Sequence, residues 1–207
     1  MAFSGMTSAE FDDVQRLNLA FLELGRTSPE CFAAAAVRPP EACLERWRNG
    51  EIARAIAALP IPYFLFRVAV DWDARSTPTL FAPSDSSSEL AVLALAFMQR
   101  LGRRERFGLR VVTGVTDAEA ARLLATSVSE LGRLARSADQ PIVPALTHLE
   151  FFWPDLILAT ANGNIARLRT LLSLGHHHQL QRAGSGEHEA QRAARRTPPP
   201  RRIADIR

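Results

Sequence analysis

The 207-residue sequence predicts a mainly α-helical fold built from two tandem units, and three observations support this prediction. Long segments place apolar side chains at helical spacing. Only two short segments have the composition of strands. Parts of the first half also recur in the second half at a nearly constant offset. We expect a first helical unit at residues 11–75, a linker at 76–88, a second helical unit at 89–150, a C-terminal helical hairpin at 151–175 and a disordered basic tail at 176–207.

The repeat consists of three short matches that occur in the same order in both halves. LAFLELGR at 19–26 matches LAFMQRLGR at 95–103, and EIAR at 51–54 matches ELGR at 130–133. Between them, VRPPEA beginning at Val37 matches VTDAEA beginning at Val115. The matches predict a duplicated unit of roughly 60 residues. Chance agreement in a chain rich in Ala, Leu and Arg is the alternative.

The first unit is expected to contain a long helix, a helix pair and a strand. Apolar residues follow helical spacing in Val14–Leu24. The helix pair is expected at Pro40–Trp47 and Glu51–Ala58, on either side of an Asn-Gly turn. Its tryptophan suits packing better than contact with DNA, so we expect this pair to be structural. Aromatic and β-branched residues predict a strand in Tyr63–Val70.

The second unit is expected to follow the same order. Nearly every residue of Leu90–Leu101 is apolar, which predicts a central core helix. A helix pair is expected in Thr116–Arg136, and a short strand in Ile142–Leu146. Thr116 or Asp117 is expected to cap the first helix of that pair, with Glu119 completing a capping box from Thr116; Ser127 or Ser129 is expected to cap the second helix.

This second pair has the residue spacing of a helix-turn-helix, in which only small side chains fit where the helices cross. Small residues expected at the crossing are Ala121 and Ala125, and apolar residues expected beneath the second helix are Val128, Leu131 and Leu134. Arginine suits contact with guanine edges and phosphates. The candidate DNA-contacting residues are Arg122, Ser129, Arg133 and Arg136. Helix pairs in bundles that never touch DNA are the alternative, and Glu130 would repel phosphate.

The order of these segments resembles the FlhD family of bacterial flagellar transcription regulators. In the first unit the resembling segments are Leu17–Leu24, Glu41–Ala58, Phe64–Val68 and the following helix Glu89–Leu101. In the second unit Leu123–Val143 resembles the family's helix-turn-helix. The resemblance implies an activator that binds promoter DNA as a dimer or with a zinc-binding FlhC-like subunit. Two units in one chain and an arginine-rich tail depart from the pattern of that family.

Beyond the two units, residues 151–175 are expected to form a helical hairpin around Asn162-Gly163-Asn164. The tail lacks apolar periodicity and cannot offset its ordering entropy, so a chain ending at Gly175 is expected to fold as well as the whole. All 25 basic residues are arginine, and the net charge is +3. Seven arginines and three acids lie from His176 onward, so the remaining chain is nearly neutral.

The same sequence offers little for catalysis, metal binding or membrane insertion. Asp71 and Asp73 would share one face of an extended segment, and His176–His178 is a run without ordered supporting groups. Cys31 and Cys43 are expected to be buried apolar residues. We therefore expect a cytoplasmic protein that is not an enzyme and needs no cofactor. A helical protein–protein interaction or adaptor protein without DNA contact is the alternative function.

Overall fold

The computed structural model describes residues 5–28, 39–70, 72, 85–138 and 141–196, with side chains described as far as residue 184. The described part is mainly helical, with a two-stranded sheet. In chain order the elements are α1 (Ser8–Thr27), the 3₁₀ helix η2 (Glu41–Cys43), α2 (Leu44–Arg48), α3 (Glu51–Ala57), β1 (Phe66–Val68), α4 (Ser86–Arg104), α5 (Arg106–Thr113), α6 (Asp117–Ala125), α7 (Val128–Ser137), β2 (Ile142–Pro144), α8 (Phe152–Ala161) and α9 (Ile165–Arg196).

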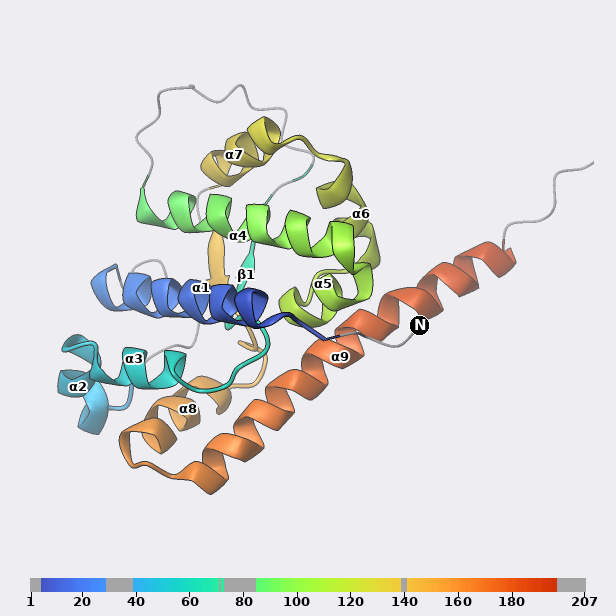
Figure 1. The fold of residues 1–207 in the computed structure, drawn as a ribbon. Coiled ribbons are helices and arrows are strands. Elements are labelled where there is room, and N and C mark those ends of the chain that lie inside the picture. The colour runs from blue at the N-terminus through green and yellow to red at the C-terminus, as the bar shows by residue number, and fades with distance from the viewer. Residues whose placement is uncertain (1–4, 29–38, 71, 73–84, 139–140, 197–207) are drawn as a thin grey trace, which may run out of the picture.

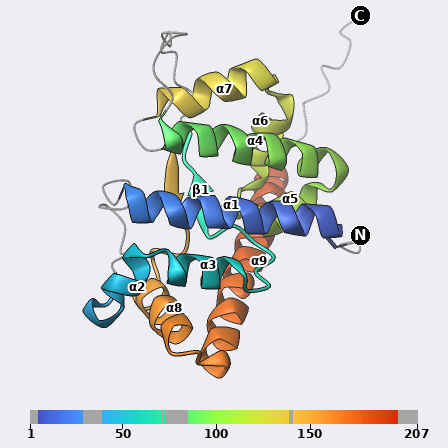
Figure 2. The ribbon, with the colours of Figure 1, turned by 60° about the vertical axis from the view of Figure 1, so that its left-hand side comes forward.

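The helices are stacked in layers, with α7 at one end and α8 at the other (Figure 1). α7 packs on α4, α4 on α1, α1 on α3, and α3 on α8. The last helix, α9, crosses this stack diagonally and contacts α8, α5 and α6. A view turned by 60° keeps α7 at the outer edge of the stack (Figure 2). α7 therefore lies in an outer layer rather than in the core.

The two long helices, α1 and α4, begin at polar caps. Thr7 and Glu10 form a capping box at the start of α1, where Thr7 N donates to Glu10 Oε2 at 2.8 Å. Asp85 caps α4 by accepting a hydrogen bond from Ser88 N at 2.6 Å. The predicted linker therefore ends too late, because its last three serines form the first turn of α4. The rest of that linker, up to residue 84, lies outside the described residues.

The predicted strand segments are confirmed, and they pair with each other. β1 and β2 are antiparallel, with Arg67 opposite Val143. The backbone beside β1 also bonds to the second half: Phe64 N donates to Val112 O at 2.8 Å, and Ala145 N donates to Leu65 O at 2.9 Å. One strand from each half thus closes a sheet in the centre of the molecule.

Buried polar groups tie α1 to the segment before β1 and to α4. Asn18 on α1 donates from Nδ2 to Tyr63 O and accepts from Leu65 N, both at 2.9 Å. Glu10 on α1 forms a two-pronged ion pair with Arg104 on α4, at 2.6 and 3.0 Å. Burial acts to raise the pKa of Glu10, but hydrogen bonds from Thr7 and the charge of Arg104 outweigh it and lower the pKa.

The two halves have similar elements and contacts, although α5 stands only in the second half, between its long helix and its helix pair. Each has a long helix (α1 or α4), a helix pair (α2–α3 or α6–α7) and a strand. In each half the long helix contacts the second helix of the pair. The long helices contact each other, and one continuous core includes Phe21, Phe64 and Phe97. A single-chain pseudo-dimer requires two such halves packed against each other. Duplication of the sequence remains a prediction.

The prediction of a disordered tail from residue 176 is wrong over residues 176–196, which continue α9. The hairpin turn at Gly163 is present, with φ +63°, but its second helix does not stop at Gly175. Gly175, Gln179 and Ala183 form a buried stripe at four-residue spacing. Two glycines permit this close packing, because a Cβ at Gly175 would lie 2.1 Å from Tyr63 Oη and one at Gly114 would lie 2.1 Å from Gln179 Oε1. Residues 197–207 lie outside the described chain.

Candidate nucleic-acid interface

The second helix pair, α6–α7, begins each of its helices at a side-chain cap. Thr116 and Glu119 form the predicted capping box of α6, in which Thr116 N donates to Glu119 Oε2 at 2.7 Å. Ser127, rather than Ser129, caps α7, and its Oγ accepts from Glu130 N at 3.3 Å. These hydrogen bonds satisfy N–H groups that a helix N-terminus leaves without partners.

A buried glutamine on α4 holds the turn between the two helices. Gln99 is 4% exposed and donates from Nε2 to Leu123 O at 3.2 Å and to Thr126 O at 2.7 Å. The sequence analysis missed this residue, because a lone glutamine in an apolar helix gives no sign of its partners. The α6–α7 turn is therefore fixed by the helix beneath it.

The predicted crossing of α6 and α7 is wrong in its register. Ala121 and Ala125 are exposed, and Val128 is 67% exposed. Both helices pack on α4 and make few contacts with each other. The small residue at the close approach belongs to α4 instead: a Cβ at Gly102 would lie 3.0 Å from Leu124 Cδ2. The pair is thus two helices seated on a shared support rather than a tightly crossed pair.

The buried face of α7 follows the prediction for Leu131 and Leu134 but not for Val128. Leu131 and Leu134 are 2% and 3% exposed, and Ala135 is fully buried. This face rests on α4, and among the described elements α7 makes its substantial contacts with α4 alone. On the opposite face, Ser129, Glu130 and Arg136 are exposed as far as the described part of the chain shows.

Three of the four candidate DNA-contacting residues share α7, and the fourth lies on α6. Ser129 is exposed, with its Oγ 3.1 Å from Ser127 Oγ. Arg133 pairs with Glu130 at 3.0 Å, and its side chain is 31% exposed. Arg136 is exposed and donates to Gly132 O at 3.3 Å. Arg122 is an exposed residue of α6.

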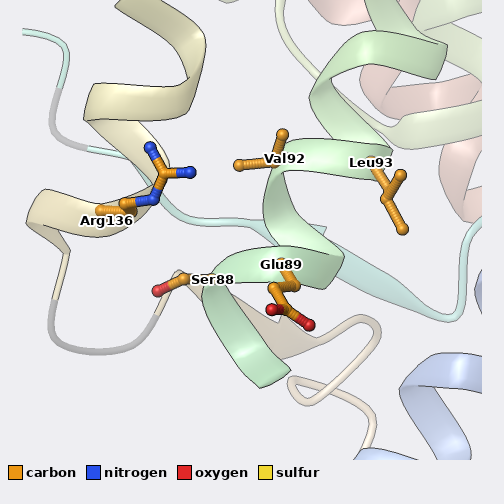
Figure 3. Close-up of a pocket in the computed structure, with 5 residues that line it drawn as sticks. All are labelled: Ser88, Glu89, Val92, Leu93 and Arg136. Atoms are coloured by element: carbon orange, nitrogen blue, oxygen red, sulfur yellow. The ribbon is translucent and has the colours of Figure 1, made fainter. Parts of the chain in front are cut away.

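Arg136 also borders a pocket of about 300 Å³ between α7 and α4. Figure 3 shows its guanidinium extending from α7 toward α4, on the side of Val92. The other lining residues, all on α4, are Ser88, Glu89, Val92 and Leu93. Leu93 is 61% exposed, which the sequence analysis missed. The sequence did hold a sign of this exposure: Leu90–Leu101 is apolar on more sides than the single core-facing side of a helix requires.

The first half has a groove in the equivalent place, between α1 and α3. Its volume is about 380 Å³, and its lining residues are Asp12, Gln15, Arg16, Leu19, Arg54, Ala57 and Ala58. The helix pair of this half is tied into the body, as predicted. Trp47 is 6% exposed, and Arg46 pairs with Glu51 while donating to Ala161 O at 2.6 Å. Arg46, Arg48 and Arg54 of this pair are nonetheless exposed, so the two pairs differ in their contacts with the body rather than in the exposure of their arginines.

The residues considered for catalysis or metal binding are in part outside the described chain. Cys43 is a free thiol buried to 2% exposure, as predicted. Cys31, Asp71 and Asp73 lie outside the described residues. Among the described residues, no three His, Cys, Asp or Glu side chains gather into a group able to hold a metal ion. Within the same part of the chain, no helix has the length and apolar character needed to cross a bilayer.

Comparison of the chain with protein-family models, curated proteins and solved structures finds no match.

Proposed function

We propose that the chain is a DNA-binding transcription regulator of FlhD-like organisation that acts on promoter DNA through α7. The observation that carries this proposal is the position of α7, an amphipathic helix in an outer layer whose support is α4. A recognition helix needs such a position, because its outward face must enter a DNA groove without clashing with the rest of the protein.

The charges on α7 favour a local, modest attraction to DNA. Ser129, Arg133 and Arg136 supply donors for bases and phosphates, whereas Glu130 neutralises Arg133 through their ion pair. Since residues 1–175 are nearly neutral, little long-range attraction comes from the rest of the body. The proposal therefore includes a second contributor at the promoter, which is either an FlhC-like subunit or another copy of the chain.

The experiment begins with selection of bound fragments from the organism's genomic DNA by the full-length protein. Replacing Arg133 by Ala is expected to weaken binding to the selected site by roughly 1–3 kcal/mol, with little effect on scrambled DNA, if Arg133 contacts a base. The matched control is Arg169→Ala, which removes an exposed arginine from the first turns of α9. Glu130→Gln frees Arg133 from its ion pair and is expected to tighten binding to any duplex.

Two outcomes contradict this proposal in different ways. Equal site preference in the Arg133 and Arg169 variants removes α7 as the reading helix. No saturable binding to any genomic fragment, with or without a candidate partner, rejects the regulator function as a whole.

A helical adaptor protein is the second candidate function, and exposed apolar side chains favour it. Val128 is 67% exposed at the start of α7, and Leu93 is 61% exposed beside the α4–α7 pocket. Large apolar residues on a surface mark protein interfaces when they are grouped. Leu93→Gln should weaken binding of a protein partner in this case, and it should leave binding of the isolated protein to DNA unchanged if α7 reads DNA, because it adds no charge beside Arg136.

A further inference from the structure

Two histidines from distant parts of the chain lie next to each other. His148 lies between β2 and α8, and His178 lies on α9. Nε2 of His148 is 3.4 Å from Nδ1 of His178, and the rings meet edge to face with centroids 4.9 Å apart. α9 brings them together only because it continues past Gly175.

The separation of the two nitrogens suits a shared metal ion better than a hydrogen bond. Hydrogen bonds of nitrogen donors have heavy-atom distances of about 2.7–3.2 Å. Two imidazole nitrogens bound to one tetrahedral zinc ion at about 2.0–2.1 Å lie about 3.3–3.4 Å apart. We infer that His148 and His178 form a two-histidine site for a divalent transition metal such as Zn²⁺, with each neutral ring carrying its proton on the nitrogen that faces away from the metal.

The neighbouring side chains define the rest of this site. Arg182 follows His178 by one turn of α9, and its positive charge acts on His148, so it opposes a bound cation. His177 is turned to Gln181, at 2.9 Å between Nε2 atoms, and His176 stacks on Tyr63. Since the described chain gathers no third His, Cys, Asp or Glu here, water completes the coordination. The bound metal would fasten α9 to the segment between β2 and α8.

The experiment is titration of the full-length protein with ZnCl₂ by calorimetry, with MgCl₂ as the hard-cation control. Zn²⁺ is expected to bind at one site and to raise the thermal midpoint, whereas Mg²⁺ does neither. His148→Ala should weaken Zn²⁺ binding at least tenfold, although it leaves the run His176–His178 intact. His178→Ala should do the same, and Arg182→Gln should tighten binding severalfold because it removes the opposing charge.

His177→Ala is the matched control, since this ring points to Gln181, and it should leave Zn²⁺ affinity unchanged. Circular dichroism checks that each variant keeps its helices, and His148 is exposed enough for its ring to be removed without disturbing the core. Unchanged affinity in His148→Ala would assign the binding to the histidine run alone and overturn the inference. Absence of saturable Zn²⁺ binding by the unaltered protein would overturn it as well.

Discussion

Replacing Gly175 by Ala tests whether α9 is docked where the structure places it. A Cβ at this position would lie 2.1 Å from Tyr63 Oη, 2.7 Å from Tyr63 Cζ and 3.2 Å from Leu146 Cδ1. Tyr63 is fully buried and its hydroxyl donates to Leu172 O at 3.2 Å, so the ring has little room to retreat. Burial raises the pKa of Tyr63 well above its ordinary value, which keeps the hydroxyl a donor.

Two opposing contributions set the size of the effect. Overpacking a close-packed site costs about 2–3 kcal/mol, whereas alanine in place of glycine inside a helix recovers up to about 1 kcal/mol. We expect Gly175→Ala to lower the free energy of unfolding by about 1–2 kcal/mol. Urea denaturation followed by circular dichroism measures this as a lower midpoint at an unchanged slope.

The same helix supplies the matched control. Gly184 has no heavy atom within 4 Å of a Cβ built on it, so Gly184→Ala should gain the helix preference without a clash and raise the midpoint. Tyr63→Phe combined with Gly175→Ala should recover part of the loss, because it removes the nearest clashing atom. A stabilising effect of Gly175→Ala equal to that of Gly184→Ala would refute the docking of α9 against Tyr63.

Three further predictions concern the contacts of α1 and α9. Because the pKa of Glu10 is lowered by folding, its contribution to stability is present above its ordinary pKa and lost as the pH falls through the lowered value. Urea midpoints between pH 7 and pH 3 should therefore fall more steeply in the unaltered protein than in Glu10→Gln. A chain ending at Gly175 should melt several degrees below a chain ending at residue 196 in scanning calorimetry, and equal melting would show that the second part of α9 adds no stability. Asn18→Ala should cost about 3 kcal/mol in urea denaturation, because it leaves the carbonyl of Tyr63 and the N–H of Leu65 buried without their partner; a loss below about 1 kcal/mol would contradict those hydrogen bonds.

Local signals in the sequence predicted much of the fold. The capping box of Thr116 and Glu119, the glycine turn at Gly50 and the two strand segments all have short-range causes. α5 was not predicted as a separate helix. α4 and α5 are separated at Glu105, whose backbone is extended. Glutamate is not a turn-forming residue, so the sequence does not indicate a break at this position.

The register of α6 could not be read from its own residues. Ala120 and Ala121 are adjacent and chemically identical, so either could face the core by composition. Ala120 is fully buried and Ala121 is exposed because α6 packs on α4, where Gly102 lies against Leu124. Contact between residues far apart in sequence decided this point.

The continuation of α9 was hidden for a different reason. Hydrophobic periodicity detects helices that bury large apolar side chains. Between Gly175 and Ala183, α9 docks through glycine, alanine and the buried amide of Gln179 instead. A stripe of this kind is read as polar and flexible, although its small residues permit the closest approach of helix and body.

The placement of β1 affects the order in which the protein can be completed during synthesis. Phe64 and Phe66 are fully buried, yet the backbone of this segment bonds to Val112 and Ala145, and the latter lies 80 positions after Leu65. At about 5–20 residues per second, the ribosome takes roughly 4–16 s to make that stretch. During this interval the backbone of the aromatic segment has not yet met the later residues to which it forms hydrogen bonds. Exposed aromatic side chains and an unpaired strand edge favour aggregation, so we expect the nascent first half to be a stage of synthesis prone to it.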